Sequence, residues 1–247
     1  MSEVKEWWNN ASSGYQSEFN LPVDIHYGPS TPNEDELQLL GDLNGKDVLE
    51  LGCGGAQCSV AFALKGATVT GIDFSSEQLK FAENLASEHN VNVTFYELDV
   101  RKLEPIADES QDIVFSAFLL LYVEDRKAVF EEAMRVLRPG GLFVFSLDHP
   151  MYRKVDPETL TMVESYHEEG ELIDDWGEFG KTSYFAFTTA DLVNQLIDTG
   201  FRLERLVEPD SRIRYDYDPW FGLYGIYVPK ILDMVPPTIV FKSRKPA

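Results

Sequence analysis

The stretch Asp47–Val60, DVLELGCGGAQCSV, constrains the fold most, because an apolar run ends directly in glycines. The run predicts a buried strand, and residues 56–66 after the glycines predict a helix. A glycine lacks the Cβ that would otherwise keep a ligand away from the backbone. We therefore expect a strand, a turn that approaches a ligand closely, and a helix whose amide end faces that ligand.

Predicted strands and helices alternate along the rest of the chain. Strands are expected at residues 47–51, 67–73, 91–99, 111–118, 142–147, 201–208 and 238–245. Helices are expected at 34–45, 56–66, 75–89, 125–141 and 188–200. This order predicts an α/β fold with a doubly wound, mostly parallel, seven-stranded sheet, because parallel strands need helical crossovers that cover both faces. Ligands of such sheets bind at the carboxyl ends of the strands.

Three segments fall outside the alternation, although the 247 residues suit a single domain, 1–247. Residues 1–36 form an aromatic and polar arm with an irregular YGPSTP connection. Residues 150–187 leave the binding edge of the sheet, and 209–237 separate the last two strands. We expect the arm to lie over a bound ligand and the two insertions to cap a substrate site. An ordinary surface excursion is the alternative for the first insertion.

The composition narrows the possible partners. The net charge is −21, and an acidic surface repels phosphate backbones, which argues against nucleic acid as a partner. Such acidity is typical of proteins from salt-rich cytoplasm and also of acidic mesophilic proteins. No apolar run reaches 18 residues and MSEVKEWWNN lacks the apolar core of a signal peptide, so we expect a cytoplasmic protein without a membrane span. Cys53 and Cys58 are expected to be reduced packing residues rather than metal ligands.

Two polar positions follow predicted strands. Asp73 ends the second strand, where a carboxylate accepts hydrogen bonds from the ribose hydroxyls of an adenosine ligand. Its alternative role is a helix N-cap. Asp99 ends the third strand, where its carboxylate would accept a hydrogen bond from an adenine amino group. Its alternative role is a solvated turn residue. The glycines fit the dinucleotide pattern G-x-G-x-x-G only in part, because Gln57 stands at the third glycine position.

Five blocks in order resemble the class I S-adenosylmethionine-dependent methyltransferases. They are VLELGCGGAQ, VTGIDFSSEQL, FYELDV, QDIVFSAFLLLYVED and VLRPGGLFVFSL, over residues 46–148. The resemblance implies a Rossmann-like methyltransferase fold whose last strand, TIVFKSRK, is antiparallel. It is strongest to small-molecule methyltransferases whose N-terminus carries Tyr-Gln and an aromatic-Gly-Pro, here Tyr15-Gln16 and Tyr27-Gly28-Pro29. It implies S-adenosyl-L-methionine as cofactor, S-adenosyl-L-homocysteine as product and a small-molecule acceptor.

The resemblance also implies a role for each matching position. The methionine part of the cofactor would be bordered by Glu50, Gly52 and Gly54, and its amino group and sulfonium by Ser116, Phe118, Leu121 and Tyr122. The adenosine part would contact Asp73, Phe74, Asp99 and Val100. Tyr15 and Tyr27 would close the cofactor from the N-terminal side, with packing on the core as the alternative.

One residue is a candidate general base. His149 follows the fifth predicted strand, at the ligand edge of the sheet, and histidine has a suitable pKa for proton transfer. The alternative is that it bonds locally and shapes the turn before Pro150. If the arm and insertions fold over the sheet, their aromatic residues predict a pocket for a flat or apolar molecule. These residues are Trp7, Trp8, Trp176, Trp220, Phe221, Tyr224 and Tyr227. The alternative is that they form a small separate core beneath the loops.

Two other functions compete with methyl transfer. An NAD-dependent oxidoreductase would use the same sheet edge, but Gln57 and the VLRPGG block argue against it. A cofactor-binding regulatory protein without turnover would need the same ligand cradle. The sequence leaves the oligomeric state and the acceptor atom open.

Overall fold

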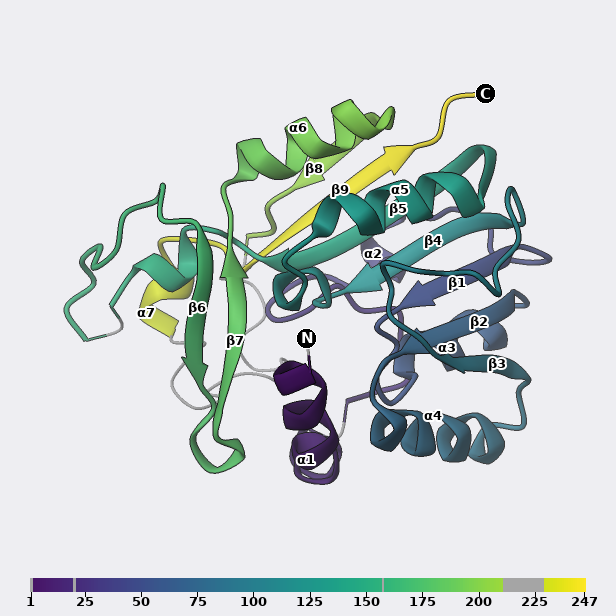
Figure 1. Ribbon diagram of the computed structural model, residues 1–247, viewed down its shortest axis with the longest axis horizontal. Helices are drawn as coiled ribbons and strands as arrows, with labels where there is room; N and C mark the ends of the chain where they lie inside the picture. Colours follow the sequence, from purple (N-terminus) through teal and green to yellow (C-terminus); the bar gives the residue numbers. More distant parts are fainter. Residues whose placement is uncertain (1, 20, 157, 211–228) are drawn as a thin grey trace.

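The computed structural model describes residues 2–19, 21–156, 158–210 and 229–247. A seven-stranded sheet with the order β3-β2-β1-β4-β5-β9-β8 forms its centre (Figure 1). The predicted doubly wound α/β sheet is therefore confirmed. Its strands are β1 Asp47–Leu51, β2 Thr68–Asp73, β3 Val93–Glu97, β4 Gln111–Ala117, β5 Leu137–Asp148, β8 Arg202–Val207 and β9 Thr238–Arg244.

Strand direction places the ligand edge. β1 pairs in parallel with β2 and β4, β2 with β3, and β4 with β5. β9 runs antiparallel to both β5 and β8, as expected for the last strand. The strand order reverses between β1 and β4, so their carboxyl ends form the crevice where such sheets bind ligands.

Helices cover both faces of the sheet. One face packs against α5 (Arg126–Val136) and α6 (Thr189–Thr199) through a core that includes Phe130, Phe143 and Phe145. The other face carries α3 (Gln57–Leu64), α4 (Ser76–Glu88) and the short α2 (Glu34–Leu37). The central strands β1, β4 and β5 are buried on both faces by these helices, which accounts for their largely apolar sequences, whereas the edge strands β3 and β8 are mostly exposed or half-buried.

Four elements differ from the sequence-based expectation. The helix predicted at 34–45 is only the four-residue α2, because Gln38 adopts a left-handed conformation that ends it after Leu37. Residues 2–19 form a helix, α1 (Ser2–Phe19), where only an arm was expected. Residues 150–187 contain a β-hairpin of β6 (Gly170–Asp175) and β7 (Lys181–Ala186). The helix predicted at 125–141 ends at Val136, because Leu137 already pairs with Gln111 and the RPGG block lies inside β5.

A separate apolar cluster joins the added elements. It brings together α1, the β6–β7 hairpin and α7 (Pro229–Leu232). We call these three elements together the cover. Its buried members are Trp7, Ala11, Phe19, Tyr152, Trp176, Ile231 and Leu232. Figure 1 shows α1 between the hairpin and α4, below the carboxyl ends of the strands. Most of the predicted insertion 209–237 lies outside the described residues.

None of the helices in the described ranges has the length and the apolar character that crossing a membrane would take.

Candidate active site

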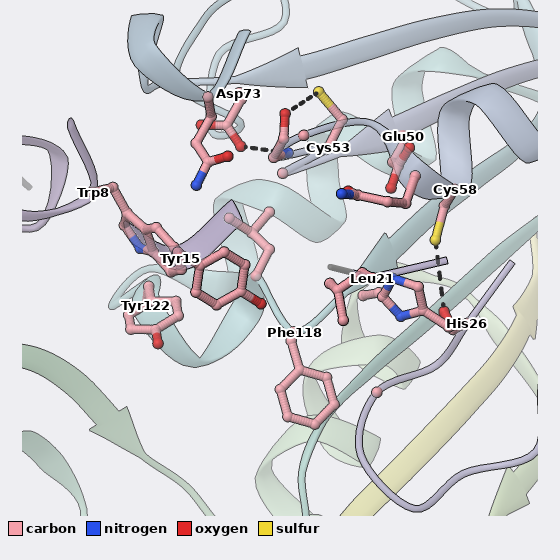
Figure 2. Close-up of a pocket in the computed structure, with 18 of the residues that line it drawn as sticks. Trp8, Tyr15, Leu21, His26, Glu50, Cys53, Cys58, Asp73, Phe118 and Tyr122 are labelled. Carbon is pink, nitrogen blue, oxygen red and sulfur yellow. Dashed lines mark hydrogen bonds between the residues drawn. The ribbon is translucent and has the colours of Figure 1, made fainter. Parts of the chain in front are cut away.

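A cavity of about 1040 Å³, counting the open solvent at its mouth, lies between the sheet edge and the cover. The glycine turn after β1 and the end of β2 form one side of it. Aromatic residues of α1 and of the turn after β4 form another side (Figure 2). The cavity therefore joins the predicted ligand turn to the predicted aromatic pocket.

The glycine turn needs glycine for its conformation. Gly52 and Gly54 have φ angles of 70° and 51°, which side-chain-bearing residues rarely adopt. A Cβ on Gly52 would lie 2.8 Å from the Cβ of Leu119. A Cβ on Gly54 would have only the Gln78 Oε1 atom nearby, at 3.8 Å. It would clash with no neighbour but would project into the cavity. The turn thus leaves its backbone open to a ligand.

Asp73 lies beside this turn at the end of β2. Its Oδ2 accepts a hydrogen bond from the Gly54 N–H at 2.9 Å, and its Oδ1 accepts one from Ser75 N–H at 2.8 Å. The N-cap of α4 is Ser75, so Asp73 does not fill that alternative role. Burial raises the pKa of Asp73 to about 6. Each carboxylate oxygen can accept a second hydrogen bond, which suits a pair of ribose hydroxyls.

Glu50 is a buried carboxyl group in the wall of the cavity, with 3% of its surface exposed. The Ser59 hydroxyl donates a hydrogen bond to it. Burial raises the pKa of Glu50 to about 8, and no lysine or arginine of the described ranges pairs with it. A ligand ammonium at this position would supply the missing positive charge.

Most of the predicted cofactor residues meet at this cavity. Its wall includes Tyr15, Glu50, Gly52, Gly54, Asp73, Phe74, Phe118, Leu121 and Tyr122. A small adjoining hollow shares Asp73 and Phe74 and adds Asp99 and Val100. The Asp99 carboxylate pairs with the Arg101 guanidinium at 2.7 Å, and the pKa of Asp99 lies below its ordinary value. The geometry is consistent with an adenine ring in the hollow.

Two predicted cofactor residues lie elsewhere. The Tyr27 ring is fully buried, packs edge-on against Phe115 at 5.6 Å, and its hydroxyl donates to Glu34. The prediction that Tyr27 closes the cofactor site is therefore wrong, and the alternative of core packing describes it. Ser116 is fully buried in β4, and its Oγ has no hydrogen-bond partner among the described residues and does not line the cavity.

The structure does not support His149 as a general base. Its Nδ1 accepts a hydrogen bond from the Met151 N–H at 3.2 Å, so Nε2 carries the proton and donates to Glu208 at 3.0 Å. Both ring nitrogens are thus engaged, and the ring lines a separate hollow beside Pro150. His149 shapes the turn after β5, which was the alternative role.

Several cavity residues had no role assigned from the sequence. His26 is buried in the cavity wall, and burial lowers its pKa to about 4, so the imidazole is neutral near pH 7. Gln16, Gln78 and Arg153 also line the cavity. Apolar positions 4, 7, 8, 11 and 15 follow a helical period, and that signal could have placed Trp8 and Tyr15 on one helix.

Comparisons with known proteins find similar methyltransferases. A family model described as a methyltransferase domain matches residues 49–145. An uncharacterized protein of Haemophilus influenzae is 27% identical over 96% of this chain and 98% of its own length. The ubiquinone biosynthesis O-methyltransferase of Pseudomonas fluorescens is 35% identical over 57% of this chain and 56% of its own length. The crystal structure of an S-adenosylmethionine-dependent methyltransferase from Mesorhizobium loti superposes with a TM-score of 0.68 at 27% identity, covering 84% of this chain and 94% of that one.

The sheet, its glycine turn and the acidic end of β2 define an enzyme that transfers a methyl group from S-adenosylmethionine. Residues 49–145 match the methyltransferase domain family, and the sheet around them has the class I methyltransferase fold. This assignment leaves no support for the oxidoreductase alternative or for a regulator without turnover. The matched segment spans about half the length of the ubiquinone enzyme. The substrate of that enzyme is therefore not assigned to this chain.

Proposed function

We propose that the cavity binds S-adenosyl-L-methionine along the glycine turn and a small-molecule acceptor against the cover. One observation carries the proposal: the glycine turn with Asp73 and the aromatic wall with Tyr15 line a single continuous cavity. A donor and an acceptor held in one cavity meet without crossing bulk water, which favours in-line transfer. Once bound, S-adenosylmethionine supplies an electrophilic methyl group.

Each part of the cavity has a chemical match in the cofactor. Asp73 would accept from the ribose hydroxyls, and the hollow with Phe74, Asp99 and Val100 would take the adenine ring. Glu50 would pair with the methionine ammonium, because it is a buried carboxyl group with no cationic partner among the described residues. The chain's own contribution is to fix both reactants and to exclude water.

Calorimetric titration with S-adenosylhomocysteine and, separately, NADH tests the cofactor assignment at low and molar KCl. We expect micromolar binding of S-adenosylhomocysteine and no binding of NADH. Both salt conditions are needed because the net charge of −21 makes the folded state sensitive to screening. Binding of NADH alone, or of neither compound at either salt, contradicts the proposal.

The cover would hold the bound cofactor in place. Gln16 of α1 donates to Gln78 Oε1 at 2.8 Å and accepts from Gln57 Nε2 at 2.9 Å. These side chains join α1 to α4 and α3 across the glycine turn. A second contact joins α1 to the N-cap of α4, since the Ser75 hydroxyl donates to Asn9 Oδ1 at 2.7 Å. We infer that residues 1–36 close over the cofactor and that 150–187 cap the acceptor.

Gln16→Ala should speed release of S-adenosylhomocysteine about fivefold to thirtyfold. It removes two side-chain hydrogen bonds that fasten α1 across the site, each contributing about 1 kcal/mol. The dissociation rate by stopped-flow fluorescence is the measurement. Glu18→Ala, an exposed position on the same helix, is the matched control and should leave the rate unchanged. Equal rates in the Gln16 variant and the control would mean that α1 does not restrain the ligand.

A further inference from the structure

The two sides of the cavity differ in their polar groups. The carboxyl groups of Glu50 and Asp73 lie at the glycine turn, where the proposed function assigns them to the cofactor. The acceptor side, formed by α1, the hairpin and the turn after β4, is mostly aromatic. Among the described residues that line the cavity, Arg153 is the one with a positive charge. The few polar groups between the aromatic rings therefore decide which acceptor fits this side.

Tyr122 brings a buried hydroxyl group to the acceptor side. The residue is 8% exposed, lines the cavity, and packs edge-on against Trp8 at 5.6 Å. Its hydroxyl has no hydrogen-bond partner within the described ranges. Figure 2 shows this hydroxyl at the end of the ring that points away from Asp73. Since buried polar groups are nearly always hydrogen-bonded, the open hydroxyl indicates a partner that binds in the cavity.

The Arg153 guanidinium lies on the same side and is fixed in position. Among its partners are the carboxylates of Asp148 and Asp174, the second at 2.5 Å, and it lies over the Tyr184 ring at 4.8 Å. The indole N–H of Trp176 donates to the same Asp174 at 2.9 Å, which ties this arrangement to the aromatic wall. The two carboxylates do not line the cavity, so a ligand there meets the guanidinium itself.

Both groups act as hydrogen-bond donors toward a ligand. A guanidinium carries N–H donors and no acceptor. Burial raises the pKa of Tyr122 well above its ordinary value, although the nearby Arg153 charge acts to lower it, so the phenol keeps its proton near pH 7. An ammonium group would bring only further donors to this place. A carboxylate would bring two acceptor oxygens and a charge opposite to that of the guanidinium.

We propose that the acceptor is an aromatic molecule with a carboxylate that binds to the Tyr122 hydroxyl and the Arg153 guanidinium. This inference rests on the proposed function, since it names the substrate class of the same cavity. The aromatic wall would contact the ring of the acceptor, and the two donors would fix its orientation. The inference concerns how the acceptor is held, whichever of its atoms receives the methyl group. Arg153 lies outside the matched segment 49–145, so this contact comes from a part of the chain that the family model does not include.

The test compares three probes of similar shape: phenylacetate, 2-phenylethanol and phenethylamine. Each is titrated by calorimetry into the full chain saturated with S-adenosylhomocysteine, so binding is measured without turnover. The pH is kept near 7.5, where phenylacetate is ionised and the Tyr122 hydroxyl is protonated. We expect phenylacetate to bind at least tenfold more tightly than the alcohol, because its hydrogen bonds to the two donors are charge-assisted. We expect phenethylamine to bind most weakly.

Three variants locate the effect. Tyr122→Phe removes the open hydroxyl and should weaken phenylacetate binding at least fivefold, while the affinity for S-adenosylhomocysteine stays that of wild type. Tyr184→Phe is the matched control and should change neither affinity. It removes a hydroxyl from the ring beneath the same guanidinium, and that ring lines the separate hollow instead of the cavity. Arg153→Lys keeps a cation beside the two carboxylates but loses the planar guanidinium, so it should also weaken phenylacetate binding at least fivefold.

The outcomes separate this inference from the proposed function. If S-adenosylhomocysteine binds but phenylacetate binds no more tightly than the alcohol or the amine, or does not bind at all, the carboxylate assignment is wrong and the cofactor assignment stands. If Tyr122→Phe weakens the binding of S-adenosylhomocysteine and leaves that of phenylacetate unchanged, the hydroxyl serves the cofactor and the inference is wrong. If S-adenosylhomocysteine does not bind to the wild-type chain, the proposed function fails and this inference fails with it.

Discussion

Asp73→Ala is expected to raise the dissociation constant for S-adenosylhomocysteine about 10- to 150-fold. This range corresponds to about 1.5–3 kcal/mol, as for loss of a charged hydrogen-bonding partner. Asp73 is nearly fully buried and both its oxygens accept backbone N–H groups, one of them from Gly54 in the ligand turn. The substitution therefore removes a ribose acceptor and also loosens the turn that the ligand contacts.

Calorimetry measures the change, and thermal unfolding without ligand shows whether the sheet survives it. Asp198→Ala, an exposed carboxylate on α6, controls for the loss of one negative charge. The pKa of Asp73 is about 6 in the free protein, so wild-type affinity should fall below pH 6 as the carboxylate takes up a proton. An unchanged dissociation constant in a folded Asp73 variant would remove this residue from the site.

Glu50→Gln is expected to stabilise the free protein at alkaline pH while it weakens cofactor binding. The pKa of Glu50 rises from 4.5 to about 8 in the folded state, so the folded chain binds a proton that the unfolded chain releases. Stability therefore falls as the pH rises from about 4.5 to 8, and the full penalty is present above pH 8. Glutamine cannot ionise and retains an oxygen that accepts from the Ser59 hydroxyl.

Urea unfolding at pH 6.5 and 8.5 tests this linkage. Asp73, with its pKa of about 6, is mostly ionised across this interval, so Glu50 dominates the difference. The wild-type free energy of unfolding should fall by about 2 kcal/mol more than that of Glu50→Gln. Glu83→Gln, at an exposed position of α4, should behave as wild type. The same pH dependence in wild type and Glu50→Gln would show that Glu50 does not titrate in this range. S-adenosylhomocysteine should bind Glu50→Gln at least tenfold more weakly if the carboxylate pairs with the ligand ammonium.

The sheet was predictable because its signals are local. Apolar runs that end in glycine or aspartate mark β1 and β2, and a helix follows each of them. Right-handed crossovers between parallel strands then place these helices on both faces of the sheet. The RPGG block shows the limit of local signals. Pro139 and the glycines after it indicate a helix end, yet the pairing of Leu137 with Gln111 starts the strand before them.

The cover was less predictable because its elements depend on one another. β6 (GELIDD) is mostly polar and exposed, and β7 (KTSYFA) has its polar residues together at its start, so both lack the apolar alternation that predicts a strand. Tyr27 and His149 show a related difficulty. Each was predicted to face the ligand, but the side chain of Tyr27 bonds to Glu34 and that of His149 bonds to Glu208. The sequence does not show which residues will form such hydrogen bonds. His26 is the reverse case, a residue with no role predicted from the sequence that lies in the cavity wall. Only this burial distinguishes it from a surface histidine.

The separate apolar core of the cover has a consequence for how such enzymes diverge. Among the described residues, the two large clusters of the sheet share no buried residue with the cluster around Trp7 and Trp176, and α1 meets the turn after β4 through a small cluster of Val4, Leu121 and Tyr122. Mutations in the cover can therefore reshape the acceptor wall while the folding of the sheet and the cofactor turn stays intact. A lineage built in this way can explore new substrates with little risk to the cofactor chemistry that it keeps.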